Sequence, residues 1–156
     1  MDNIARDFNS LPRPEKTPTG LPNHWVFTVR HVPLEPQGDL VFAVHPRSHF
    51  VLSKGPAQIL TSDDHAVRAE ALVPHLLKAF IDAHVNPSTG RAEGGVQATS
   101  PWTWATDDVN LAKAVSSELK QHGVTEALCS VGTCSTEEKD VLKENWSRLV
   151  GSMMKM

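Results

Sequence analysis

The first third of the chain contains two runs in which large apolar residues recur at every second position. Residues 25–30 read Trp-Val-Phe-Thr-Val-Arg and residues 40–44 read Leu-Val-Phe-Ala-Val, a pattern typical of strands. A connection that contains Pro and Gly separates the two runs, so they predict a hairpin. Two shorter apolar runs, residues 50–52 and 57–60, flank Gly55-Pro56, which can turn but cannot continue a strand ladder. The sequence therefore predicts an N-terminal antiparallel sheet of three or four strands.

A helical period follows, and a polar cap opens it. Residues 62–64 read Ser-Asp-Asp, whose side-chain oxygens can accept the first N–H groups of a helix that continues to about residue 84. Pro74 lies inside this helix and lacks an N–H group, so it predicts a kink or two abutting helices. Residues 86–99 are rich in turn formers, and we expect a mobile polar loop with a weak strand at 96–98.

The stretch from residue 100 to residue 124 combines strand, cap, helix and stop signals. Trp102 and Trp104 lie two residues apart, so in a strand they share a face, and Thr106 is the predicted N-cap of the helix that follows. Gly123 comes just after the last apolar position of that helix. A glycine there predicts a left-handed helix stop.

The last quarter of the chain predicts a strand and a helix. Residues 127–131 form a short apolar run, and residues 135–138 read Ser-Thr-Glu-Glu, a capping box that opens a helix running to about residue 150. The order of elements predicts an α/β (α+β-like) single domain. In it an N-terminal antiparallel sheet precedes a long helix and then a strand, helix, strand and helix.

The globular domain is expected over residues 23–150. Residues 1–22 carry four prolines and little apolar periodicity, which is typical of a flexible arm or of an extended segment that packs on the domain, and we expect the flexible Pro-rich arm. Residues 151–156 are expected to fray.

Composition narrows the classes of function. The 156 residues suffice for one core, and a net charge of −3 with a pI near 6.2 argues against binding of nucleic acid. No apolar run approaches the length of a membrane span, and the first residues lack the apolar core of a signal peptide. Two cysteines do not make a disulfide scaffold. We therefore expect a soluble, intracellular protein, cytoplasmic or nuclear.

Two groups of residues could carry chemistry. His45 and His49 have the spacing of a helical metal site, but Pro46 and the flanking strands argue against a helix there, and we expect no metal or other cofactor. Cys134 precedes the last helix, whose dipole can lower a thiol pKa, while Cys129 fits a small core residue. No base for a nucleophilic cysteine can be identified in the sequence.

Four residues are candidates for binding. Trp102 and Trp104 could line an aromatic recognition surface, although one of them must enter the core. Asp107 and Asp108 follow a predicted strand at the point where α/β sheets often bind ligands. Helix capping alone also explains both carboxylates.

The run Pro-Trp-Thr-Trp-Ala-Thr-Asp-Asp, with Leu-Ala-Lys-Ala-Val, Glu-Ala-Leu-Cys-Ser-Val-Gly-Thr-Cys-Ser-Thr-Glu-Glu-Lys and Trp146, resembles an uncharacterised domain of mushroom-forming fungi. That domain can accompany MYND-type zinc fingers, and the resemblance covers about residues 100–150. The cysteine ligands of the finger itself are absent here, so the resemblance implies no metal site. It implies an intracellular accessory or interaction domain and brings no catalytic residues.

The first hypothesis is a protein-interaction module without catalysis, which binds a protein partner or a second copy of itself through an exposed tryptophan. A second hypothesis is a small hydrolase or transferase that uses Cys134, or His45 with His49, beside a pocket under the 86–99 loop. A third is a small-molecule binding protein, which requires a pocket that the sequence does not reveal.

Overall fold

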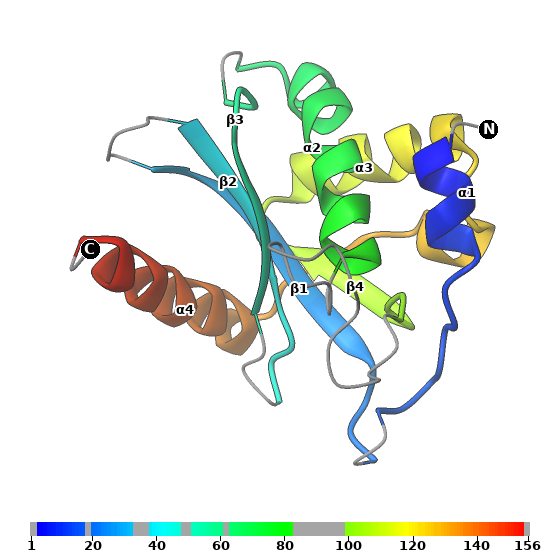
Figure 1. Ribbon diagram of the computed structural model, residues 1–156, viewed down its shortest axis with the longest axis horizontal. Coiled ribbons are helices and arrows are strands. Elements are labelled where there is room, and N and C mark those ends of the chain that lie inside the picture. The colour runs from blue at the N-terminus through cyan, green and yellow to red at the C-terminus, as the bar shows by residue number, and fades with distance from the viewer. Residues whose placement is uncertain are drawn as a thin grey trace.

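The computed structural model describes residues 3–17, 20–32, 38–47, 51–60, 63–82 and 99–154. Their strands form one five-stranded sheet in the order β3-β2-β1-β4-β5 (Figure 1). The strands are β1 (His24–Val32), β2 (Gly38–Val44), β3 (Val51–Ala57), β4 (Thr103–Thr106) and β5 (Gly132–Thr133). The helices are α1 (Asn3–Asn9), α2 (His65–Ile81), α3 (Val109–His122), α4 (Thr136–Met154) and the short 3₁₀ helix η1 (Glu126–Leu128).

Strands β1, β2 and β3 form the predicted antiparallel part of the sheet. β1 pairs with β2 so that Val29 lies opposite Val41, which confirms the hairpin. The prediction of two short strands around Gly55-Pro56 is wrong, because both residues lie within β3. The register between β2 and β3 shifts there, and β3 is an edge strand. A proline is tolerated at an edge and beside such an irregularity.

The second half of the chain extends the same sheet. β4 pairs with β1 in parallel, with Trp104 opposite Trp25, and β5 pairs with β4 in parallel. The sheet is therefore mixed and continuous, so the α/β fold class is confirmed as one sheet with helices. The strand predicted at 127–131 is displaced: most of that run forms η1 and its exit, and β5 follows at Gly132–Thr133.

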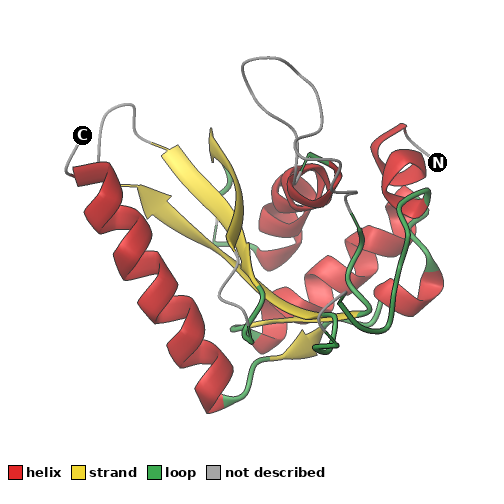
Figure 2. Ribbon diagram, turned by 60° about the horizontal axis from the view of Figure 1, so that its bottom comes forward, coloured by secondary structure: helices red, strands yellow, loops and turns green. Residues whose placement is uncertain are grey.

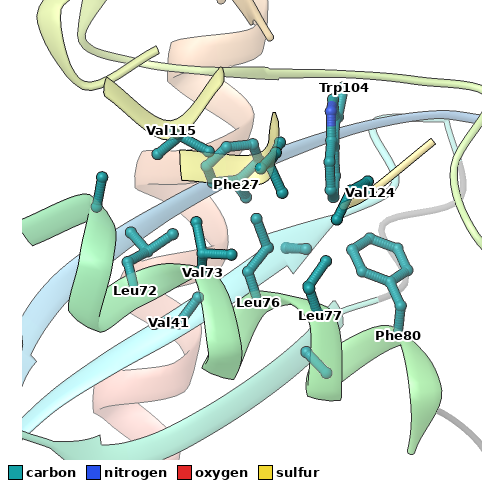
Figure 3. Packing of buried hydrophobic residues seen from close by; sticks show 14 of the residues in the cluster. Phe27, Val41, Leu72, Val73, Leu76, Leu77, Phe80, Trp104, Val115 and Val124 are labelled. Atoms are coloured by element: carbon teal, nitrogen blue, oxygen red, sulfur yellow. The ribbon is translucent and has the colours of Figure 1, made fainter. Parts of the chain in front are cut away.

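Helices cover the two faces of the sheet unequally. α1, α2 and α3 pack on one face, and α4 lies on the other (Figure 2). The main core lies under the three helices, where α2 residues meet side chains of β1, β2, β4 and α3 (Figure 3). A smaller cluster forms under α4, where Trp146 stacks on Phe42 with ring centroids 5.5 Å apart.

The described N-terminal residues contact the rest of the domain through side-chain and backbone groups. Phe8 is fully buried and stacks on Trp104 with ring centroids 5.8 Å apart. Asn9 donates to the carbonyl of Gly123 and accepts from the N–H of Thr125. Further along, the carbonyl of Pro12 accepts from the N–H of Ser100. Long-range contacts therefore hold a segment whose local sequence carries no strong signal.

Helix ends agree with the sequence in most places. Asp64 caps α2, and the predicted capping box of Ser135 and Glu138 forms at the start of α4.

α2 is continuous, so the chain does not divide into two helices at Pro74. α4 continues to Met154, so residues 151–154 are helical where fraying was predicted. The predicted loop and weak strand at 86–98 lie outside the described residues.

The ends of α3 contain one correction and one confirmation. Its N-cap is Asp108, whereas the predicted cap, Thr106, is the last residue of β4 and donates to the carbonyl of Phe27. Gly123 adopts the left-handed conformation, with φ of 84°. The N–H groups of Gly123 and Val124 donate to Lys120 and Leu119, as in a Schellman motif.

None of the helices in the described part of the chain has the length and apolar composition needed to cross a membrane.

Candidate functional site: a polar cleft at the carboxyl edge of the sheet

A cleft of about 330 Å³ lies where β1 and β4 end. The two strands are parallel, so their carboxyl ends meet at the same edge, and the chain then enters α3 from β4. This is the edge at which α/β sheets bind ligands. We call it the carboxyl-edge cleft. Its polar wall consists of Thr28, Arg30, His31, His65, Arg68, Asp107 and Asp108, and its apolar floor of Val29, Leu60 and Leu111.

A hydrogen-bonded network between β1 and the end of β4 fixes one wall of the cleft. Thr28 Oγ1 donates to Asp107 Oδ1 at 2.9 Å, and Arg30 Nη1 donates to Thr28 Oγ1 at 2.6 Å. Arg30 Nη2 pairs with Asp107 Oδ2 at 2.5 Å. Thr28 is buried, and the Asp107 side chain is mostly buried. The charged groups of this wall are therefore held in place before any ligand arrives.

Asp108, the next residue of the same polar wall, joins α2 to α3. Its Oδ1 accepts from the N–H groups of Asn110 and Leu111, and its Oδ2 lies 3.4 Å from His65 Nε2. Burial raises the pKa of Asp108, but the hydrogen bonds from Leu111 and Asn110, together with His65, outweigh it and the pKa is lowered. Asp108 is therefore a charged cap, and Asp107 is an ion-pair partner rather than a second cap.

A third carboxylate supports the floor of the cleft. Asp39 Oδ2 accepts from the N–H groups of Ile59 and Leu60 at 2.9 and 2.7 Å, which fixes the Leu60 segment against β2. Its Oδ1 lies 3.1 Å from Nδ1 of His31, a wall residue. Asp39 is buried, so its carboxylate interacts with these groups of the protein rather than with solvent.

The structure separates the two candidate tryptophans. Trp104 is 2% exposed and donates through Nε1 to the carbonyl of Leu128, so it is a core residue. Trp102 is 38% exposed, and the guanidinium carbon of Arg13 lies 4.2 Å from the centre of its ring. The predicted shared face does not form, because β4 begins at Thr103 and Trp102 precedes it.

The cysteines do not have the environment of a nucleophile. Cys134 is buried, and this burial, with repulsion from Glu138 and Asp107, raises its pKa to about 12. The predicted lowering by the α4 dipole is therefore wrong for this thiol, since desolvation exceeds it. Burial also raises the pKa of Cys129. Both thiols are core residues of the second half of the domain.

We expect native Cys134 to react with iodoacetamide at least roughly a hundredfold more slowly than the same thiol in the urea-unfolded chain, because its thiolate is scarce and enclosed. Mass spectrometry of digests taken over time at mildly alkaline pH measures both rates. Equal rates in the two states would restore the hypothesis of a catalytic cysteine.

Only His45 of the two candidate metal ligands, His45 and His49, lies within the described residues. His45 is buried, and its Nε2 donates to the carbonyl of Pro22 at 2.8 Å, while its ring meets Trp25 edge-on. His49 lies outside the described residues. Across the ranges that the structure describes, no group of three or more His, Cys, Asp or Glu side chains could hold a metal ion.

A second groove, of about 620 Å³, lies at the opposite end of β1, beside the first turn of α4. Three of its polar residues, His24, Ser135 and Glu138, hold the fold together, and Arg47 and Glu137 also line it. Glu138 Oε1 accepts from the N–H of Ser135, and Glu138 Oε2 pairs with His24 Nε2 at 2.6 Å. The smaller carboxyl-edge cleft lies where two parallel strands end, so we take it as the candidate site.

Sequence reasoning finds only part of the cleft. It names Asp107 and Asp108, but it does not single out Arg30, His65 or Arg68. One signal points to Arg30: Thr28 and Arg30 lie two residues apart on one face of a strand whose residues 25–27 are all apolar. Comparison with protein-family models, curated proteins and solved structures gave no match.

Proposed function

We propose that this protein is an interaction module that works without catalysis, and that the carboxyl-edge cleft is where it contacts a protein partner. The observation that carries the proposal is the pre-formed polar wall, in which Arg30, Thr28 and Asp107 fix one another before binding. Fixed groups lower the entropic cost of association. A cleft of about 330 Å³ suits one side chain of a partner.

The bonding of the acidic groups supports binding over catalysis. Asp107 is paired with Arg30, and Asp108 is charged and accepts from two backbone N–H groups of α3. A general acid or base must exchange a proton near the working pH, whereas the hydrogen bonds from Leu111 and Asn110 lower the pKa of Asp108 and favour its ionised form. The raised pKa of Cys134 argues against the alternative enzyme. The resemblance of residues 100–150 to an accessory domain, and the cytoplasmic location expected from composition, belong to the same proposal.

The surface around Trp102 is a second candidate for the contact. An exposed tryptophan with an arginine over its ring is the kind of group that dominates binding energy in protein interfaces. Arg13 also donates to the carbonyl of Trp102 at 2.6 Å, so the pair is held as a unit. Trp102 therefore belongs in the same experiment as the cleft.

Selection from a random peptide display library tests the proposal and needs no candidate partner. We expect enriched peptides to bind a His65→Ala/Arg68→Ala double variant at least about tenfold more weakly than the unaltered protein, because two side chains of the cleft wall are lost. A Lys143→Ala/Arg148→Ala double variant, altered on the exposed side of α4, should bind like the unaltered protein. Isothermal calorimetry with synthetic peptides measures the affinities.

The same peptides separate the alternatives. Loss of binding in Trp102→Ala at an unchanged melting temperature, with the cleft variant unaffected, would move the contact to the tryptophan surface. Equal binding by all variants would contradict both locations. A library that yields no binder would favour the free small molecule as the ligand of the cleft.

A further inference from the structure

We propose that the N-terminal strap of this chain, residues 3–16, exchanges between two copies, so that α1 of each copy lies in the groove of the other. The occupant of the groove in the dimer is therefore the strap of a second copy. This self-association goes beyond the proposed function and does not depend on the carboxyl-edge cleft. Three features support it: the contacts that hold the strap, the shortness of α1, and the turn that joins the strap to β1 (Figure 1).

The groove that receives α1 is apolar and aromatic. Ala5 and Phe8, the two buried residues of α1, are both fully enclosed. The Phe8 ring stacks on Trp104 of β4 and meets Phe80 of α2 edge-on. A single aromatic side chain of α1 is thus the anchor of the strap, and its partners belong to elements far along the chain.

Hydrogen bonds of the strap likewise run to distant residues. Asn9 Nδ2 donates to the carbonyl of Gly123, and Asn9 Oδ1 accepts from the N–H of Thr125, both at 2.9 Å. The carbonyl of Pro12 accepts from the N–H of Ser100 at 2.9 Å. Because these partners lie outside the strap, a second copy offers the same set of donors and acceptors in the same arrangement.

α1 needs a groove because it is short. Its 7 residues are too few to hold a helix in water without tertiary contacts. A chain whose strap has left the groove therefore exposes Phe8 together with the apolar surface that receives it. Docking on a second copy remakes the same contacts, so the exchanged dimer and the closed monomer differ chiefly at the turn and in the entropy of association.

The chain reverses direction between the strap and β1. The N–H of Thr17 donates to the carbonyl of Leu21 at 2.8 Å, and the N–H of Gly20 donates to the carbonyl of Thr17 at 2.9 Å. Lys16 and Pro22 form an antiparallel bridge on either side of this turn. When these bonds open, residues 17–21 can extend over at most about 17 Å, which brings the strap to a second copy that lies beside the turn.

The sequence of the turn favours its opening. Gly20 adopts a φ of 85°, the left-handed region, which the closed turn requires and an extended chain does not. Pro18 and Pro22 restrict the residues before them, Thr17 and Leu21, to extended conformations through steric clash. The turn is therefore the hinge of the exchange, and its closed form depends on one glycine.

Two variants of the full chain test the exchange, Asn9→Cys in one copy and Thr125→Cys in the other. In the exchanged dimer the two new thiols meet, because Asn9 Oδ1 lies 3.0 Å from Thr125 Oγ1. We expect the mixed variants, one of them isotope-labelled, to form a disulfide between position 9 of one copy and position 125 of the other under mild oxidation. Mass spectrometry of digests identifies the linked peptides. Asp7→Cys, exposed on the same helix, is the matched control and should give only the yield of random collisions.

Gly20→Val tests the hinge. A Cβ at position 20 meets no heavy atom within 4 Å, so valine acts through the backbone conformation alone, which it disfavours in the left-handed region. Because both hinges of a dimer lose this strain, we expect the dimer dissociation constant from analytical ultracentrifugation to fall at least about tenfold. Gly20→Asn, which tolerates the left-handed region, should change the constant much less.

The outcomes separate the exchange from its hinge. A disulfide yield for Asn9→Cys no greater than that for Asp7→Cys would overturn the exchange. A dissociation constant that is the same in Gly20→Val and in the unaltered protein would overturn the role of the turn. Neither result concerns peptides at the carboxyl-edge cleft, so the proposed function is judged separately.

Discussion

Replacing Phe8 by alanine is expected to lower the free energy of unfolding by about 3–5 kcal/mol, the usual cost of deleting a fully buried aromatic ring. The Phe8 ring stacks on Trp104 and meets Phe80 edge-on, with centroids 6.2 Å apart. It is the largest fully buried side chain of α1, a helix of 7 residues that is too short to persist without tertiary contacts. Removing it leaves a cavity beside two aromatic rings, and urea denaturation measures the loss.

Asp7→Ala is the matched control, because Asp7 lies on the same helix and is exposed. It should change the unfolding free energy by no more than about 0.5 kcal/mol. If Phe8→Ala costs as little as the control, the N-terminal segment does not pack in solution, and the flexible arm that its composition predicts is restored.

Replacing Asp39 by alanine is expected to cost about 3 kcal/mol. The buried carboxylate accepts from the N–H groups of Ile59 and Leu60, and the alanine variant leaves both donors without an acceptor. Because Leu60 lines the floor of the carboxyl-edge cleft, the variant should also weaken peptide binding at the cleft. Urea denaturation measures the first effect and calorimetry with a selected peptide the second.

Asp39 also gives stability a defined dependence on pH. Burial raises the pKa of Asp39, but hydrogen bonds from Leu60, Ile59 and His31 outweigh it, so the folded-state pKa lies below the ordinary value of 3.8. A lowered folded-state pKa means that this contribution is present above 3.8 and is lost as the pH falls from there through the folded-state value. In Asp39→Asn the unfolding free energy should no longer show this fall at acidic pH. Asp63→Asn, at a fully exposed position, should leave the fall unchanged. If the unfolding free energy of Asp39→Asn falls at acidic pH as in the unaltered protein, the Asp39 carboxylate does not accept from the N–H groups of Ile59 and Leu60.

The sequence by itself determined the features that depend on near neighbours. The caps Asp64, Ser135 and Glu138 act on N–H groups within three residues, and the stop at Gly123 uses carbonyls within five. Alternation likewise predicted β1 and β2, because a strand with a buried face must repeat every two residues. These signals are local, so they can be read whatever the segment packs against.

Tertiary structure decided the conformation of those segments whose local signals were weak or favoured two structures equally. Gly55-Pro56 carries a turn signal, yet the edge position and register shift of β3 accommodate both residues in one strand. In the apolar run 127–131, Leu128 and Cys129 are buried through η1 and its exit, so the strand forms only after this run, at Gly132–Thr133. Phe8 is buried only because Phe80 and Trp104, far away in the sequence, provide a surface for it.

The candidate site shows the same division. Asp107 and Asp108 could be named because they follow a strand, and Asp108 could be expected to cap a helix. Arg30 meets Asp107 across 77 positions of sequence, and only the parallel pairing of β1 with β4 brings them together. His65 reaches Asp108 only because α2 and α3 begin at the same edge of the sheet. A site whose side chains come from distant segments depends on the order of the strands in the sheet. That order is set by the burial of the whole core rather than by any one stretch of the chain.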